Sequence, residues 1–127
     1  MSKDFRNTDR PGLYCIELRT ANWPASVEWY RGALGLKVLV RVVDDGYALL
    51  EAGETRLALL ARDAPGEPTT RISFAFEVHD LNDTMLRLKR AGVEVSAPQL
   101  SHEGLREINL TDPDGNRIRL FSWQQSQ

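Results

Sequence analysis

The sequence predicts an α+β protein made of two βαβββ modules. One indication is the stretch Asp112-Pro113-Asp114-Gly115-Asn116, a turn after which apolar Ile118 and Leu120 alternate with polar or outward-facing residues. This alternation is typical of a strand with one face in the core. Another is an earlier stretch in which the turn glycine Gly53 precedes a similar strand at 55–61. The chain therefore contains this turn and strand twice.

A constant spacing between the two halves is the third indication. Five pairs of positions with matching roles lie 58 residues apart: Cys15 and Ser73, Asn22 and Asp80, Trp23 and Leu81, Val27 and Met85, Tyr30 and Leu88. Leu57 and Ile118 lie 61 residues apart, as do Leu59 and Leu120, which indicates an insertion of three residues in the second half. A strand, a capped helix and three strands at matched spacings indicate an internal repeat.

The first module is expected to span residues 12–62, after an N-terminal arm at 1–11. Alternation predicts a strand at 13–20 with its core face at Tyr14, Ile16 and Leu18. Asn22 is a suitable N-cap for a helix that ends at Gly35. Its core stripe is predicted at helical spacing, at Trp23, Val27, Tyr30 and Leu34. Strands are then predicted at 36–43, 47–51 and 55–61, separated by glycine-containing turns.

The second module is expected at 70–122, after a Pro- and Gly-containing linker at 63–69. Its first strand should bury the apolar set Ile72, Phe74, Phe76 and Val78. Asp80 caps the second helix, whose core face is predicted at Leu81, Met85 and Leu88. A short strand is predicted at 93–95, a loop at 98–103 and a strand at 105–110, before the final turn and strand. Residues 123–127 form a polar tail.

Composition narrows the class of function. The net charge of −2 shows no excess of Lys and Arg, so neither nucleic acid nor a membrane surface is expected as a partner. No apolar run approaches the ~20 residues that a membrane span requires. The single cysteine, Cys15, excludes an internal disulfide and predicts a cytoplasmic location.

Three motifs carry a resemblance to a known family. They are Ser26-x-x-Trp29-Tyr30-x-x-x-Leu34-Gly35-Leu36, Leu88-x-x-Ala91-Gly92-Val93, and the Asp112–Asn116 turn. Together with the repeat, they resemble the vicinal oxygen chelate superfamily over residues 12–122. This superfamily includes glyoxalase I, extradiol dioxygenases, fosfomycin-resistance enzymes and bleomycin-resistance binding proteins. The resemblance implies mixed sheets that curl into an open cup, and a homodimer.

The resemblance also indicates where enzymes of this family hold a divalent metal, namely the first and fourth strand of each module. Carried over by position, these sites are Cys15, Ala58, Ser73 and Arg119. None is His or Glu, and a guanidinium cannot deprotonate to accommodate a cation. We therefore expect no metal and no cofactor. One alternative is a metal held by displaced ligands drawn from Cys15, Glu17, Glu107 and His102.

The metal-free, bleomycin-resistance-like branch is the nearest in character. This resemblance implies a protein that sequesters a small organic ligand, with antibiotic resistance as one role of such a protein. The candidate ligand-binding residues are those of the concave face: Cys15, Glu17, Ala58, Ser73, Ala75, Glu107, Asn109, Arg119 and Phe121. Arg119 is expected to pair with Glu17 or Glu107, whereas Arg19, Glu77 and Arg117 are expected to point into water. No catalytic residue is assigned.

Two other functions remain open at this point. One is an enzyme of the same fold, a lyase, isomerase or dioxygenase with unusual metal ligands or none. The other is an interaction scaffold whose cup is filled by its own ion pairs. Cys15 is interpreted as an inert small residue, because no histidine is placed to activate it. His79 and His102 are interpreted as solvated surface residues.

Overall fold

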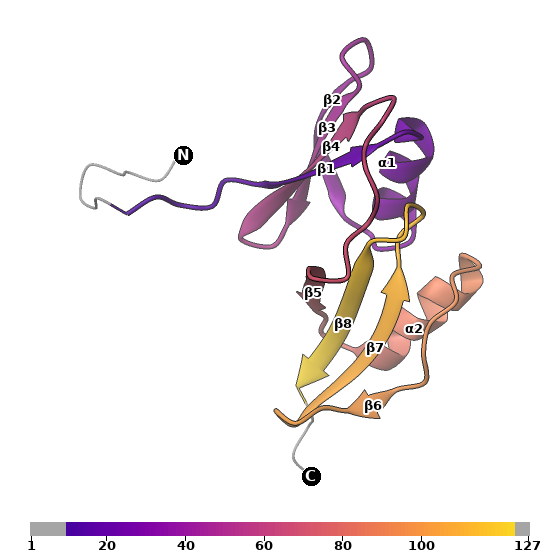
Figure 1. Ribbon diagram of the computed structural model, residues 1–127. Helices are drawn as coiled ribbons and strands as arrows, with labels where there is room; N and C mark the ends of the chain where they lie inside the picture. Colours follow the sequence, from indigo (N-terminus) through magenta and orange to yellow (C-terminus); the bar gives the residue numbers. More distant parts are fainter. Residues whose placement is uncertain (1–9, 124–127) are drawn as a thin grey trace.

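The protein, as a computed structural model, is described over residues 10–123 and forms two four-stranded sheets, each with one helix. Figure 1 shows the two modules one above the other, with α1 and α2 on the same side. The elements in chain order are β1 (Ile16–Thr20), α1 (Trp23–Gly32), β2 (Lys37–Val42), β3 (Tyr47–Ala52), β4 (Thr55–Ala61), β5 (Ser73–Glu77), α2 (Leu81–Arg90), β6 (Gln99–Leu100), β7 (Leu105–Thr111) and β8 (Arg117–Trp123). The predicted α+β class with two βαβββ modules is confirmed.

Both sheets have the same topology. Sheet one has the strand order β1-β4-β3-β2, and sheet two has the equivalent order β5-β8-β7-β6. The first strand of each module pairs in parallel with the last, and the other neighbouring strands pair antiparallel. A parallel pair requires a crossover connection, which the helix and the two intervening strands supply. The sheets do not close, and each has a helix against one face only.

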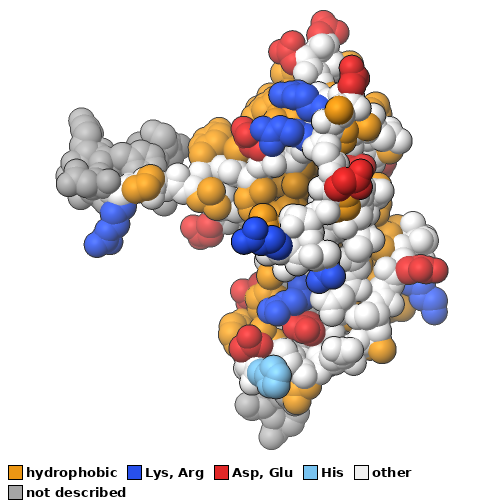
Figure 2. All heavy atoms as spheres, viewed as in Figure 1, with side chains coloured by type: hydrophobic (Ala, Val, Ile, Leu, Met, Phe, Trp, Pro, Cys, Tyr) orange, Lys and Arg blue, Asp and Glu red, His pale blue; other side chains and the backbone are white. Residues whose placement is uncertain are grey.

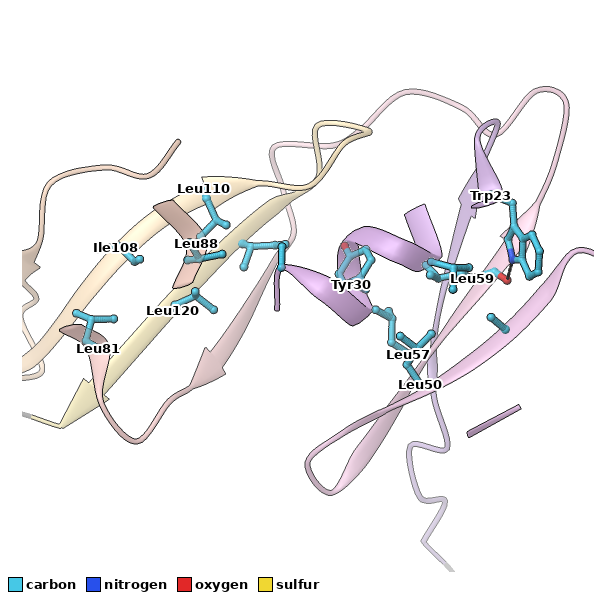
Figure 3. Close-up of a cluster of buried hydrophobic side chains, with 14 residues drawn as sticks. Trp23, Tyr30, Leu50, Leu57, Leu59, Leu81, Leu88, Ile108, Leu110 and Leu120 are labelled. Carbon is cyan, nitrogen blue, oxygen red and sulfur yellow. Dashed lines mark hydrogen bonds between the residues drawn. The ribbon is translucent and has the colours of Figure 1, made fainter. Parts of the chain in front are cut away.

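One apolar core runs through both modules on the helix side of the sheets (Figure 3). Tyr30 of α1 and Leu88 of α2 are fully buried, as are Leu50 and Leu59 of sheet one. Each such side chain contributes about 1.5–3 kcal/mol relative to exposure. The predicted helical stripes are therefore confirmed, with Leu34 and Met85 packed at the edge of the core.

Two polar contacts orient α1 on this core. The Trp23 indole N–H donates to the Leu59 carbonyl at 3.0 Å. The Tyr30 hydroxyl donates to Asp112 Oδ2 at 2.5 Å, which links the first helix to the turn before the last strand. Trp29, which lies beside the stripe, makes an edge contact with the Tyr30 ring, their centroids 5.0 Å apart.

The two helices begin differently. Asp80 caps α2 as predicted, because its side chain accepts the Asp83 N–H at 3.1 Å. Asn22 occupies the equivalent position before α1, but its side chain makes no capping hydrogen bond. Its backbone N–H donates instead to Thr20 Oγ1, at 3.1 Å. Asn22 therefore occupies the predicted N-cap position and the helix begins at the expected residue, but its side chain does not cap the helix.

The short second strand of the second module lies at a different place than predicted. Residues 93–95 form no strand, and the pairing is made at 99–100, inside the predicted loop, where Gln99 lies opposite Glu107. Val93 and Val95 instead pack on the core edge. The chain reaches β7 through Ser96, whose N–H donates to the Asn109 carbonyl at 3.0 Å. The strand was predicted at 93–95 because of the two valines there. In the structure these valines pack against the core without pairing to another strand.

The ends of three strands also differ from the prediction. Tyr14 and Ile72 were assigned to the core, but each precedes its strand and is 59% and 60% exposed, respectively. Trp123, assigned to the tail, is the last residue of β8. The remaining tail and most of the predicted arm lie outside the described residues. Neither described helix has the length and apolar character of a membrane span.

Candidate functional site

The open face of sheet two is the more polar of the two open faces. β8 lies between β5 and β7, so Arg119 has Ala75 on one side and Asn109 on the other. Its neighbours along the strand, Ile118 and Leu120, are buried against the helix, which places Arg119 on the opposite face. We call this surface the sheet-two face; its residues are Ser73, Ala75, Glu107, Asn109, Arg117, Arg119 and Phe121. Figure 2 shows basic and acidic side chains gathered over the region of β5 and β8.

The predicted ion pair is present on this face. Arg119 Nε lies 3.4 Å from Glu107 Oε1, with the two side chains 32% and 13% exposed. These two atoms are buried and form no hydrogen bond, so their contact is electrostatic. Glu17, the alternative partner, lies 3.6 Å from Arg19 instead. The pairing hypothesis is confirmed for Glu107.

An aromatic pair continues the sheet-two face toward the end of β8. The Arg119 guanidinium carbon lies 5.7 Å from the centroid of the Phe121 ring. Phe121 in turn makes a perpendicular contact with Trp123 at 6.1 Å between centroids. The face therefore offers a cation, a carboxylate and an exposed aromatic surface in sequence along two neighbouring strands.

The open face of sheet one is apolar by contrast. Leu49, Ala58 and Leu60 form a small buried cluster there, with Cys15 and Tyr47 packed against it. Val40 lies opposite Leu49, and Val42 opposite Tyr47; these two valines are 42% and 37% exposed. We call these seven residues the sheet-one face. In Figure 2, apolar side chains gather over sheet one where the N-terminal segment leaves it.

The environment of Cys15 does not activate its thiol. Burial raises the pKa of Cys15, and the neighbouring Glu17 carboxylate raises it further, while Arg56 opposes these effects. A raised pKa lowers the thiolate fraction at neutral pH, and the thiolate is the reactive form. The arrangement favours the inert role predicted for Cys15.

The predicted ligand-binding residues fall into two groups. Cys15, Glu17 and Ala58 lie on sheet one, whereas the other six lie on sheet two, and no strand pairing joins the sheets. A cavity of about 180 Å³ lies between the modules, where Ser73 and Ala75 meet Thr55 and Arg56. Ala58 is fully buried beneath its neighbours, so it offers a ligand no surface of its own in the single chain.

Other cavities are lined mostly by residues that the sequence did not indicate as a site, Glu17 being an exception. One of about 450 Å³ brings Glu17 and Arg19 together with the linker and with Asp114 and Asn116. A larger one, about 600 Å³, lies at the start of α2, between Asp80, Arg106 and Trp123. Only the tertiary fold brings these distant segments together, so no local motif indicated them.

The side chains at the implied metal positions do not fit a divalent ion. Within residues 10–123, no group of three or more His, Cys, Asp or Glu side chains is placed to hold one. Glu107, the carboxylate beside the implied position, is already paired with the permanent cation of Arg119. Metal sites require several donors with suitable geometry, and a fixed positive charge at the same place opposes a second cation.

Two βαβββ modules with one open face on each sheet define the structural class of this protein. The chain belongs to the Glyoxalase/Bleomycin resistance protein/Dioxygenase superfamily, whose family model matches residues 12–120.

Similar proteins include both uncharacterised and named members. The chain is 29% identical over 123 residues to the uncharacterised protein YraH of Bacillus subtilis strain 168, covering 86% of this chain and 96% of that protein. It is 28% identical over 122 residues to biphenyl-2,3-diol 1,2-dioxygenase 3 of Rhodococcus globerulus; this alignment spans 89% of the chain but just 64% of the dioxygenase. The solved bleomycin resistance determinant encoded on transposon Tn5 superposes with a TM-score of 0.70 at 22% identity, covering 93% of this chain and 100% of that one.

Proposed function

We propose that the protein binds and sequesters a small organic molecule without a metal, as a homodimer in the cytoplasm. The observation that carries this proposal is the Arg119–Glu107 pair, because Arg119 occupies one of the positions at which the family resemblance implies a metal ligand. The Arg119 guanidinium can bind polar atoms of a ligand directly through its N–H groups. It cannot replace a metal ion as a Lewis acid.

The homodimer is part of the proposal. The sheet-one face leaves Val40 and Val42 partly exposed beside an apolar cluster, although such residues are normally covered. A second copy placed over this face would bury them. A second copy of the chain is the proposed partner, because the commonest soluble oligomers are twofold dimers in which both copies use the same surface.

Metal analysis together with a ligand screen tests the proposal. Purified full-length protein should contain no stoichiometric nickel, zinc, manganese or iron by elemental mass spectrometry. A panel of aromatic antibiotics and metabolites should include compounds that raise the melting temperature. A ligand at 100 times its dissociation constant adds about 2.7 kcal/mol to the free energy of unfolding. One bound metal ion per chain would contradict the metal-free proposal.

A second candidate is an enzyme of the same fold, favoured by the similarity to biphenyl-2,3-diol 1,2-dioxygenase 3. Oxygen uptake in the presence of Fe²⁺ and biphenyl-2,3-diol distinguishes it from a binding protein. Sustained uptake above the protein-free control would support the enzyme. A flat trace, together with ligand-induced stabilisation, would support sequestration. If no ligand in the panel stabilises the protein, the interaction scaffold becomes the better explanation.

A further inference from the structure

β8 carries two arginines on the sheet-two face, and they lie two positions apart in the strand. Arg117 and Arg119 flank Ile118, which is 1% exposed and points into the core, so both arginines project from the open side. Arg117 lies beside Ser73 of β5 and Thr111 of β7, and Arg119 has similarly small neighbours in Ala75 and Asn109. The two guanidinium groups therefore stand among short side chains that leave the space above them open.

Most hydrogen-bond donors of these arginines have no acceptor. Arg119 uses its Nε for the 3.4 Å contact with Glu107, and this contact lacks hydrogen-bond geometry. In the described part of the chain, Arg117 forms no ion pair and no side-chain hydrogen bond. A guanidinium has five N–H donors in a fixed planar arrangement. The two guanidinium groups on β8 therefore have donors available to bind a chemical group that carries several acceptor oxygens.

Negative charges near this pair do not neutralise it. Glu107 faces Arg119 directly, and the Glu103 carboxyl lies close enough for Arg119 to contribute to lowering its pKa. The Glu103 pKa is lowered first by a hydrogen bond from the Ser101 side chain, so this carboxylate already has a nearer partner. Glu77 lies opposite Phe121 at the far end of β5. Within residues 10–123, Arg117 forms an ion pair with none of these carboxylates.

We propose that Arg117 and Arg119 recognise an oxyanion, a carboxylate or phosphonate, on a ligand whose planar body rests on Phe121. This inference rests on the proposed function, because it assigns the ligand class of the same face. Arginine binds such groups through paired N–H···O contacts, which are stronger than neutral hydrogen bonds. The Phe121 ring lies 5.7 Å from the Arg119 guanidinium carbon, so an aromatic ring bonded to the oxyanion reaches it. Glu107 keeps Arg119 oriented.

Four probes of one shape test the proposal: benzoate, phenylphosphonate, benzamide and benzylamine. Each is titrated into ¹⁵N-labelled full-length protein, and the Arg Nε–H signals and β8 amides are followed by NMR. Benzoate or phenylphosphonate should shift the Arg119 Nε–H and the β8 amides. Benzamide and benzylamine should bind at least about tenfold more weakly, because they lack the charge that these arginines recognise.

Matched variants identify the residues responsible. R119Q should weaken benzoate binding about tenfold or more, and R117Q should do the same. Because Arg117 is exposed, R117Q leaves the core intact and remains informative even if R119Q does not fold. E107Q should strengthen benzoate binding a few-fold by removing a competing charge. R31Q serves as the control, because Arg31 is paired with Glu28 on α1, and its affinity should not change.

The outcomes distinguish oxyanion recognition from the sequestration proposal on which it rests. Equal affinities for benzoate and benzamide, or unchanged benzoate binding in R117Q and R119Q, would overturn oxyanion recognition. If neutral or cationic compounds stabilise the protein and shift β8 while neither anion does, sequestration stands and the oxyanion inference fails. If no compound in either panel binds, both proposals fail.

Discussion

The hydrogen bond between the Tyr30 and Asp112 side chains joins the two modules across 82 residues of sequence. The Tyr30 hydroxyl donates to Asp112, which is 4% exposed and also accepts N–H groups from Asp114 and Asn116. The carboxylate therefore shapes the turn before β8 and anchors α1 at the same time. Burial, followed by the nearby Asp112 charge, strongly raises the pKa of Tyr30.

Replacing Tyr30 should have an effect that depends on pH. We expect Y30F to lose about 1–3 kcal/mol of unfolding free energy at neutral pH, because a hydrogen bond to a charged partner is removed. In the unfolded chain tyrosine ionises near pH 10, whereas folded Tyr30 stays protonated. Above about pH 10, stability of the wild type should therefore fall by about 1.4 kcal/mol per pH unit from this residue alone. Urea unfolding at pH 7 to 11.5 measures both effects.

The control for this prediction is Y14F, since Tyr14 is 59% exposed and lies outside the core. Its stability at neutral pH should stay within about 0.5 kcal/mol of the wild type. If Y30F and the wild type lose stability with equal slopes above pH 10, the Tyr30 hydroxyl does not titrate as described.

At the scale of the helix, the two N-termini offer a matched comparison. D80A should destabilise the protein by about 0.5–2 kcal/mol, because it removes the acceptor for the Asp83 N–H. N22A should cost less than about 0.5 kcal/mol, since the Asn22 side chain makes no capping hydrogen bond. Chemical denaturation of the two variants checks the difference. A larger loss for N22A than for D80A would contradict this account of the caps.

Two turns in sheet one provide a second comparison at the scale of the element. Gly46 and Gly53 both have positive φ, at 59° and 68°. A Cβ on Gly46 would lie 2.5 Å from the Cβ of Ala61, whereas a Cβ on Gly53 meets nothing within 4 Å. G53A should therefore cost only the backbone strain, about 1–2 kcal/mol. G46A should cost about 1–3 kcal/mol more, because β4 must shift.

Thermal unfolding of the two glycine variants, followed by circular dichroism, measures this difference. G46A should have the lower melting temperature of the pair. Equal melting temperatures would mean that Ala61 moves aside without cost, and that strain in the turn is the whole effect.

For the whole molecule, the sheet-one face provides the test of assembly. We expect the wild type to sediment as a dimer, and V42E to raise the dimer dissociation constant about a hundredfold or more by burying an unpaired charge. L100E is the control, because Leu100 is 63% exposed on sheet two. Analytical ultracentrifugation measures all three proteins. A dimer that persists in V42E but dissociates in L100E would place the interface elsewhere.

Much of the candidate site was accessible from the alternation of side chains within strands. Residues two apart share a face, so Arg119 and Phe121 were both predicted on the concave face, and Arg119 was predicted to pair with Glu107 or Glu17. The sequence did not indicate which of the two carboxylates pairs with Arg119, because this depends on β7 lying beside β8. Glu17 lies on the other sheet, where Arg19 is nearer.

The sequence by itself determined the two modules, both helices and most of the strands, and which side chains within those strands face away from the core. These features depend on local periodicity, turn residues and repeat spacing, all of which are written in consecutive positions. The tertiary structure alone decided where the second strand of the second module pairs, how Tyr30 meets Asp112, and that Ala58 is fully buried. These depend on segments up to 82 residues apart, whose contacts are selected by packing of the whole chain and leave no local pattern.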